Sequence, residues 1–299
     1  MSQVQTSDTA IKGPRIGESA LRPDGIPKVK GEFVFSNDLR HPDMLWGGTL
    51  RSPHPAARIV SINVTSALKM TGVHAVITSE DLDDMPLYGL EHPDQPVLAD
   101  GLVRYQGEPV AIVAADHPEN VRLALEAIDV EYELIEPLSD PNLAKEAEAI
   151  HPDGNLFREI DLTHGNSQEE GEIIVEGTYE VGMQDQAPLG TESGMAIPSE
   201  DGGIDLFVST QWLHADRDQV AACLNLPTEK VRLTLAGVGG AFGAREDISL
   251  HIHLCLLAIK TGKPIKMSYS RTESFHGHVH RHPAQMWYRH HAKSDGTLT

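Results

Sequence analysis

The 299 residues are enough for two ordinary domains, and a hydrophobic share of 40% is typical of a globular protein. The 24 basic and 44 acidic residues give a net charge of −20, which argues against nucleic acid or anionic lipid as the main partner. No run reaches the ~18 apolar residues of a membrane span, and a polar start without a signal-peptide centre favours a cytoplasmic protein. Two cysteines, Cys223 and Cys255, are too few for a disulfide framework or for an iron–sulfur cluster held by this chain alone.

The first part of the chain predicts a mixed α+β unit. Residues 1–24 show no periodicity and are expected to form a flexible lead-in. Residues 25–137 alternate short apolar runs with helical patterns, and Pro118 sits where prolines favour a first helical turn. The expected strands are residues 33–35, 44–50, 57–64, 73–77 and 131–135, and residues 105–115 are expected to be a turn that leads into a buried strand. The expected helices are 65–70 and 118–130.

A segment rich in Pro, Asn, Asp, Glu and Gly, residues 138–172, is expected to be a linker to a second unit, residues 173–299. That unit begins with a strand over residues 173–182, and Asp201-Gly-Gly203 is a hairpin signal. Its further expected elements are strands at residues 204–208 and 231–235 and a helix at 214–224.

The strongest motif is the glycine loop, residues 237–243, which carries Gly237, Gly239, Gly240 and Gly243 around Phe242. It follows a strand, and helical spacing from 246 to 260 predicts a helix directly after it. This arrangement turns backbone N–H groups toward a bound anion or oxo group, although a tight connection needing positive φ would use the same glycines. The loop matches neither G-x-G-x-x-G nor a P-loop.

The glycine loop and the Arg245-Glu246 pair after it resemble the Gly-Gly-x-Phe-Gly-x-Lys/Arg-Glu loop of the molybdenum hydroxylases, the xanthine dehydrogenase and aldehyde oxidase family. Residues 50–59 and 105–111 resemble that family's hammerhead domain. The resemblance covers roughly residues 24–299 and comes nearest to bacterial xanthine dehydrogenase. It implies an α+β fold: a hammerhead-type α/β domain, then the first, incomplete part of a molybdopterin-binding α+β domain.

The resemblance also implies site residues. Gln184 stands at the position of a glutamine that contacts the oxo side of the molybdenum centre, although Gln186 and Gly190 replace a histidine and a frequent glutamate. Glu246 stands where purine-oxidising members carry a glutamate that binds the heterocycle; a helix-start acid favouring the dipole is the plainer alternative. The residues implied to bind cofactor are Gln184, Gly240, Phe242, Gly243 and Arg245.

The implied cofactor is a molybdenum–pterin, as molybdopterin or its dinucleotide form, with no protein ligand to the metal and with iron–sulfur and flavin groups on partner subunits. The implied reaction places water-derived oxygen on a purine carbon next to nitrogen. An aldehyde or another N-heterocycle is the alternative substrate, and a non-catalytic truncated or assembly module is the alternative role. Membrane and nucleic acid are not expected as partners.

The family's later substrate residues and general base have no counterpart in these 299 residues. We therefore expect the remaining half of the molybdenum subunit as a partner, and no activity from this chain alone.

One further pattern is the run His276-Gly-His-Val-His-Arg-His282, whose four histidines would share a face in a strand. Imidazole suits zinc, copper or nickel, but the sequence shows no cysteine or well-placed carboxylate to join them. The sequence therefore predicts no metal site at this run.

Overall fold

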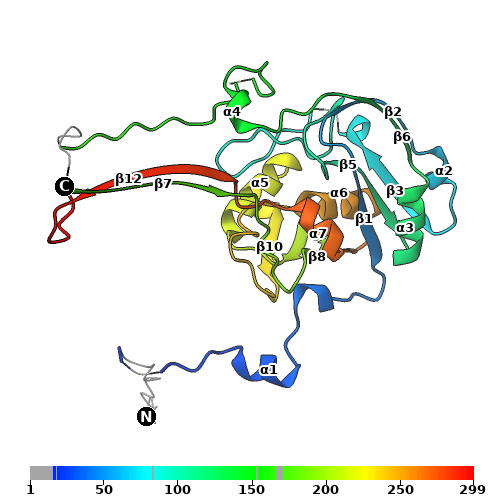
Figure 1. The fold of residues 1–299 in the computed structure, drawn as a ribbon. Helices are drawn as coiled ribbons and strands as arrows, with labels where there is room; N and C mark the ends of the chain where they lie inside the picture. Colours follow the sequence, from blue (N-terminus) through cyan, green and yellow to red (C-terminus); the bar gives the residue numbers. More distant parts are fainter. Residues whose placement is uncertain (1–15, 18, 83, 153, 166–170) are drawn as a thin grey trace, which may run out of the picture.

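A seven-stranded sheet forms the body of the computed structural model, which describes residues 16–17, 19–82, 84–152, 154–165 and 171–299. Its strand order is β10-β9-β8-β11-β1-β5-β3 (Figure 1). The strands are β1 (Leu45–Arg51), β3 (Val73–Thr78), β5 (Pro109–Ala115), β8 (Ser193–Pro198), β9 (Ile204–Val208), β10 (Val231–Leu235) and β11 (Ile265–Ser268).

Strand β5 shows why this sheet lies inside the protein. All seven of its residues are buried, and it pairs antiparallel with both β1 and β3. Successive side chains of a strand face opposite sides. Ile112 and Ala114 accordingly join one apolar cluster, while Ala111 and Val113 join another. The continuous apolar run of β5 is therefore needed to pack both faces of the sheet.

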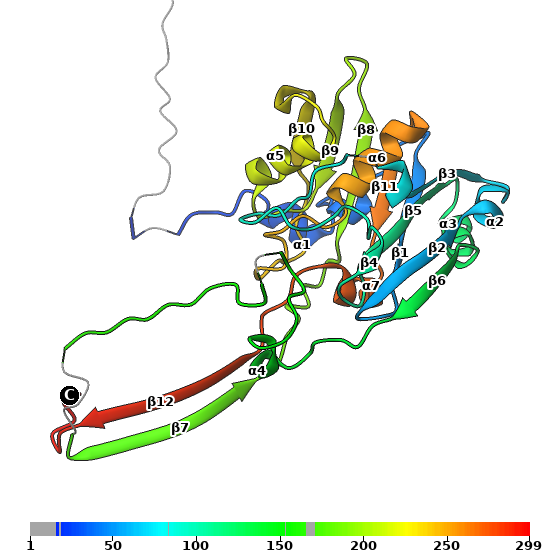
Figure 2. The same cartoon turned by 90° about the horizontal axis from the view of Figure 1, so that it is seen from above.

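Helices cover the two faces (Figure 2). Helices α5 (Leu213–Cys223) and α6 (His251–Thr261) pack on one face, and α2 (Thr65–Leu68) and α3 (Pro118–Glu126) on the other. The remaining helices are α1 (Gly25–Lys30), α4 (Pro141–Ala144) and α7 (Arg271–Gly277), with 3-10 turns η1 (Ser36–Asp38), η2 (Ser79–Asp81) and η3 (Thr228–Lys230). Among the described residues, no helix combines the length and apolarity that a membrane crossing requires.

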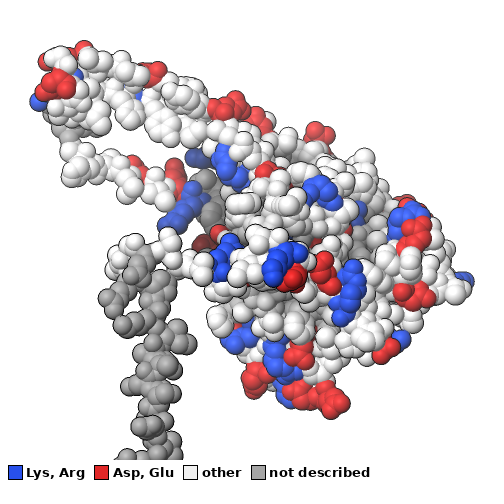
Figure 3. Space-filling model, turned by 90° about the horizontal axis from the view of Figure 1, so that it is seen from below, with Lys and Arg blue, Asp and Glu red and all other residues white. Residues whose placement is uncertain are grey.

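Two smaller sheets complete the fold. Strand β2 (Ala57–Asn63) pairs with β4 (Leu102–Val103) and β6 (Asp129–Leu134). Strands β7 (Ile173–Val181) and β12 (Ala284–Ala292) form an antiparallel ribbon that projects from the body in both ribbon views. Figure 3 shows basic side chains interspersed with acidic ones on the face it presents, so the net charge does not gather there into one patch.

The mixed α/β class with a hammerhead portion is confirmed, but the large sheet crosses the expected boundary between the two units. Strands β1, β3 and β5 come from residues 25–137, and β8 to β11 come from residues 173–299. The joint is a parallel pairing of β1 with β11, with Leu45 opposite Ile265. The division at residues 138–172 stays our proposal, and the expected lead-in lies largely outside the described residues. The shared sheet predicts that both units unfold together.

Most expected strands lie within a few residues of the observed ones, but the strand expected at residues 33–35 is wrong. Only Phe35 forms a bridge, to Gly237. The chain turns at once because the Asp38 carboxylate accepts a hydrogen bond from the Phe35 N–H at 3.0 Å, which fixes the short turn η1. Elements β11, β12 and α7 were not predicted from the sequence.

The helix expected from Glu246 is also wrong at its start, because α6 begins at His251. In a helix starting at Glu246, the Arg245 carbonyl would accept from the Ser249 N–H. Instead that carbonyl accepts from the Gln211 N–H at 2.9 Å. The Ser249 N–H donates to His251 Nδ1 at 3.2 Å. Glu246 therefore lies in a turn between the glycine loop and the helix.

A substitution of Gly47 in β1 tests whether the two units, which share the large sheet, unfold together. A Cβ there would lie 2.7 Å from Met267 Cγ and 3.0 Å from Leu257 Cδ1. We expect Gly47→Ala to lower the free energy of unfolding by about 1–3 kcal/mol through overpacking. Gly182→Ala, where a Cβ enters open space, is the matched control. Urea unfolding followed by circular dichroism and tryptophan fluorescence should give one coincident transition; two separate transitions would show that the units fold independently.

Candidate functional site

Three loops meet at one edge of the large sheet because of how β8, β9 and β10 pair. Strands β9 and β10 are parallel, with Val208 opposite Leu235, so both end at the same edge. Strand β8 is antiparallel to β9, with Gly194 opposite Val208, so it begins there. The segment before β8, the turn after β9 and the loop after β10 are thereby brought together. We call residues 184–192 the glutamine loop.

The glycine loop has a backbone that few side chains tolerate. The φ angles are 107° at Gly240, 57° at Phe242 and 92° at Gly243, all in the left-handed region. A phenylalanine in this region is uncommon and costs conformational energy. Phe242 is nonetheless 77% exposed, so burial of its side chain does not offset that conformational energy. A strained loop with an exposed aromatic ring is a feature of binding sites rather than of simple connections.

The glutamine loop lies directly against the glycine loop. The Gly190 N–H donates to the Gly239 carbonyl at 3.0 Å. A Cβ on Gly239 would stand 2.9 Å from Gly190 Cα, and one on Gly190 would stand 3.0 Å from Gly239 Cα. Neither position therefore has room for a side chain. This contact explains the glycine at position 190, where the family that the sequence resembles frequently has a glutamate.

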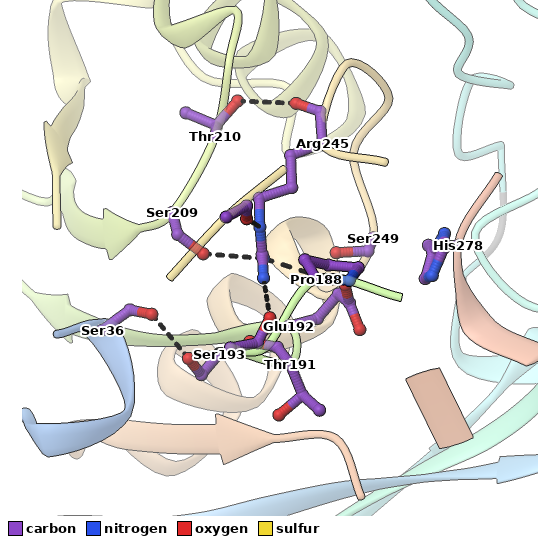
Figure 4. Close-up of polar contacts among 12 residues, drawn as sticks. Ser36, Pro188, Thr191, Glu192, Ser193, Ser209, Thr210, Arg245, Ser249 and His278 are labelled. Atoms are coloured by element: carbon purple, nitrogen blue, oxygen red, sulfur yellow. Dashed lines mark hydrogen bonds and ion pairs between the residues drawn. The ribbon is translucent and has the colours of Figure 1, made fainter. Parts of the chain in front are cut away.

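Arg245 holds the two loops together from inside the protein (Figure 4). Its side chain is only 4% exposed. Its Nε donates to the Gly240 carbonyl at 3.0 Å, Nη1 to Ser209 Oγ at 2.8 Å, and Nη2 to the Gly190 carbonyl. Burial lowers the pKa of Arg245, and the Glu192 carboxylate, 3.8 Å from Nη1, opposes that shift. These donors bind protein atoms, so the geometry gives Arg245 a positioning role.

Gln211 fixes the far end of the glycine loop. Its Oε1 accepts from the N–H groups of Gly243 at 3.2 Å and Arg245 at 3.3 Å. Its own N–H donates to the Arg245 carbonyl. From the sequence, the Ser209-Thr-Gln211 turn is only the lead-in to a helix. The signal that could have found Gln211 is its place directly after a strand, where parallel strands bring their ends together.

A buried pair supports the turn that carries Gln211. Thr210 Oγ1 donates to Asp216 Oδ2, which lies 3.6 Å from His251 Nε2. Burial raises the pKa of Asp216 to about 6 and lowers the pKa of His251 to about 3. His251 is therefore neutral near pH 7. Its Nδ1 accepts from the Ser249 N–H, so its proton is on Nε2, facing Asp216.

Gln184 is exposed and pairs with Arg281 rather than with the glycine loop. The two residues form an antiparallel bridge, and Gln184 Oε1 accepts from Arg281 Nε at 3.4 Å. Gln186 comes nearer to the loop: its Nε2 lies 3.9 Å from the position of a Cβ on Gly243, and its Oε1 is buried without a hydrogen-bond partner. Within the described residues, the structure thus brings Gln186, not Gln184, to the loop.

Glu246 lies beside a second carboxylate. It is half-buried, and no hydrogen bond to its side chain occurs within the described part of the chain. Its neighbour Asp247 has a raised pKa, chiefly through burial and then through the Glu246 charge. Asp247 also lines a cavity of about 210 Å³ with Tyr88, Tyr105 and Tyr269. Glu246 is therefore placed to receive a donor group from outside the chain.

The loops present a surface that fits a polar cofactor. Among the described residues, the amides of Gly240, Ala241 and Phe242 make no hydrogen bond to the chain. A cavity of about 240 Å³ lies against Gly190 and Gly239. Unpaired amides, the unpartnered oxygen of Gln186 and an adjoining cavity together suit a ligand rich in oxygen acceptors.

The histidine run does not form the single strand face considered from the sequence. His276 belongs to α7, while His278 and His280 lie in the extended segment after it. A carboxylate does join them: Asp185 Oδ2 is 3.1 Å from His278 Nε2 and 3.0 Å from His280 Nε2. The expectation that no carboxylate is near was wrong, because the bridge between Gln184 and Arg281 is a long-range pairing that local sequence cannot show.

Comparison with known proteins matches both parts of the chain to family models. Residues 30–136 match the aldehyde oxidase and xanthine dehydrogenase a/b hammerhead domain, and residues 150–299 match a molybdopterin cofactor-binding domain.

Curated relatives include a probable xanthine dehydrogenase subunit of Bacillus subtilis, 38% identical over 94% of this chain and 38% of that relative. The nicotinate dehydrogenase large molybdopterin subunit of Eubacterium barkeri is 36% identical over 95% of this chain and 68% of that relative. Among solved structures, the aldehyde oxidoreductase of Desulfovibrio gigas superposes with a TM-score of 0.86 at 27% identity, covering 93% of this chain and 33% of that one. The chain thus spans less than two fifths of the Bacillus relative.

The buried pair of Arg245 and Glu192 yields a prediction. Arg245→Met should lower the free energy of unfolding by about 3–5 kcal/mol, because it leaves the Glu192 carboxylate buried and uncompensated. Adding Glu192→Gln removes that charge and should restore part of the loss, as measured by urea denaturation. Arg217→Met, at an exposed arginine, should change stability by no more than about 0.5 kcal/mol. A double variant no more stable than Arg245→Met would show that Glu192 is not the relevant partner.

Proposed function

Because the chain belongs to the xanthine dehydrogenase and aldehyde oxidase family, we propose that it forms part of the molybdenum-binding subunit of a purine hydroxylase. The observation that carries the proposal is the close contact between the glycine loop and the glutamine loop. Arg245 joins the two loops, and both lie in the residues that match the molybdopterin cofactor-binding domain. Its partners are the remaining part of the molybdenum subunit and subunits with iron–sulfur clusters and FAD. Both cysteines of this chain are free and buried, which suits a cytoplasmic role in purine catabolism.

The residues that we assign to the cofactor are those whose polar groups lack a hydrogen-bond partner in the described part of the chain. We assign cofactor contacts to the amides of Gly240 and Phe242 and to the side chain of Gln186, whose buried oxygen lacks a partner. Gly243 permits the cofactor to approach the backbone of the loop closely, since only Gln186 lies within 4 Å of a Cβ placed there. The sequence resemblance assigns Gln184 to the metal's oxo side, a role in which the cofactor would reach from the glycine loop to the bridge of Gln184 with Arg281. When bound, the pterin-held molybdenum supplies the oxidation that places water-derived oxygen on carbon.

The other residues of the site keep this surface in place. Arg245 bonds the glycine loop at Gly240 and Gln211 bonds it at Gly243, so the N–H groups between these points are oriented before a ligand arrives. Donors fixed in advance stabilise developing negative charge better than donors that must reorganise. The exposed Phe242 ring offers an apolar surface beside these donors.

Glu246 provides the argument for a purine. Its carboxylate is half-buried and free of protein partners within the described residues, and it can accept a hydrogen bond from a ring N–H. A simple aldehyde has no such donor. The Bacillus relative is named a probable xanthine dehydrogenase subunit, which supports the same substrate class.

A nicotinate-type substrate is the second candidate, because the chain spans 68% of a nicotinate dehydrogenase subunit at 36% identity. Nicotinate is itself a carboxylate, however. Glu246 and Asp247 would place two carboxylates near it, and like charges at close range repel. The electrostatics of this turn therefore favour a neutral heterocycle.

We expect Glu246→Ala, in the complex with the remaining part of the subunit, to lower kcat/KM for hypoxanthine by about 10- to 150-fold, the loss of one charged hydrogen bond of about 1.5–3 kcal/mol. The rate on a simple aldehyde should change little. Steady-state kinetics on both substrates and on nicotinate give the required ratios.

Two controls accompany this measurement. Gln184→Ala should slow all substrates alike, since its proposed contact is with the cofactor. Asp247→Asn changes the adjacent carboxylate and should leave the purine-to-aldehyde ratio near that of the wild type. An unchanged ratio in Glu246→Ala, or faster turnover of nicotinate than of hypoxanthine by the wild type, would refute the purine assignment.

A further inference from the structure

Two histidines and one aspartate meet beside the proposed cofactor site. Asp185 lies in the glutamine loop, and His278 and His280 lie in the segment after α7. The segments are held side by side by the antiparallel bridge of Gln184 with Arg281, whose N–H and carbonyl groups bond at 3.3 and 3.0 Å. One ligand atom from each of the three side chains lies within 4.8 Å of the others.

The cluster is shielded from water but not closed. The side chains of His278 and Asp185 are 1% and 10% exposed, and His280, at 19%, forms the more open side. His278 Nε2 and Asp185 Oδ2 are buried without any hydrogen-bond partner. Buried polar atoms nearly always have a partner, so these two need an explanation.

The hydrogen bonds around the cluster fix which atoms face inward. His278 Nδ1 lies 2.6 Å from the Val279 carbonyl, which is an acceptor only, so Nδ1 carries the proton. The ring then points its Nε2 at the Asp185 carboxylate, 3.1 Å from Oδ2. The other carboxylate oxygen, Oδ1, accepts from the Ala187 N–H, which orients Oδ2 toward the histidines. A proton or a metal ion between His278 Nε2 and Asp185 Oδ2 would satisfy both of these buried atoms.

The two histidines face the same carboxylate oxygen from neighbouring positions. The two imidazole rings are stacked, with centroids 5.0 Å apart and an interplanar angle of 19°. Two imidazolium rings in this arrangement would repel each other, and the Arg281 guanidinium is adjacent in the chain. A single divalent ion would satisfy both nitrogens and the carboxylate oxygen together.

We propose that Asp185, His278 and His280 bind one divalent transition-metal ion, with zinc as the ion that suits two imidazoles and a carboxylate. Ligand atoms around tetrahedral zinc at about 2.0–2.1 Å stand roughly 3.3 Å apart. The observed separations of 3.0 and 3.1 Å are close to this value. The Val279 carbonyl and the Ala187 N–H act as the outer hydrogen-bond partners that orient metal ligands.

Three protein ligands leave a fourth coordination position for water or a small ligand. His278 also lines the cavity of about 210 Å³ that Asp247 borders. The ion would cross-link the segment that carries Gln184 to the segment that carries Arg281. Asp185 lies between Gln184 and Gln186, so the ion would lie beside the proposed cofactor site, but the inference uses none of the cofactor contacts and does not depend on the proposed function.

Titration of the metal-free full chain with Zn²⁺ by calorimetry, and with Co²⁺ by visible absorption, tests the proposal. We expect one ion per chain and the intense visible bands of four-coordinate Co²⁺. Asp185→Asn and His278→Gln should each weaken binding by at least about 100-fold, more than loss of an outer hydrogen-bond partner usually costs. His282→Gln, an exposed histidine of the same run, is the matched control and should bind as the wild type does.

Zinc should also raise the melting temperature of the wild type but not of Asp185→Asn, which detects binding even where a variant is less stable. If His278→Gln fails to fold, His280→Gln, at the more exposed ligand, takes its place. Binding that is unaffected by Asp185→Asn, or the absence of one-to-one binding by the wild type, would overturn the proposal and leave a proton-bound His–Asp–His cluster.

Discussion

The candidate site depends on one buried guanidinium. Arg245 spans the space between the glycine and glutamine loops and bonds the carbonyls of Gly190 and Gly240. Burial of a charge is costly unless it is paired and hydrogen-bonded, and here Glu192 and Ser209 complete its surroundings. Those donors bind protein carbonyls, and the amides of Gly240, Ala241 and Phe242 stay unpaired within the described chain and are held ready for a ligand.

That arrangement follows from the sheet. Strands β8, β9 and β10 bring three loops to one edge, and β1 and β11 join this half of the sheet to the hammerhead half. The site and the hammerhead portion therefore share one core, even though different family models match residues 30–136 and 150–299.

Much of the fold and the outline of the site could be predicted from the sequence. The apolar run of β5 and the glycines of residues 237–243 are local signals, and they are sufficient by themselves to indicate the buried strand and the loop. The start of α6 and the grouping of Asp185 with the histidines were missed. Both depend on hydrogen bonds between residues far apart in the chain, such as that from Gln211 to the Arg245 carbonyl. Local periodicity carries no information about such contacts.

The central claim is that the touching glycine and glutamine loops form the molybdopterin cradle. Gly239→Ala tests it most directly, because the added Cβ would lie 2.9 Å from Gly190 Cα and force the loops apart. Molybdenum and pterin should be quantified in the purified complex of this variant and of Gly25→Ala, where a Cβ meets only an ordinary 3.6 Å contact. The account predicts that Gly239→Ala loses most of its molybdenum and pterin while Gly25→Ala and wild type retain theirs. Full cofactor content in a folded Gly239→Ala complex would contradict it.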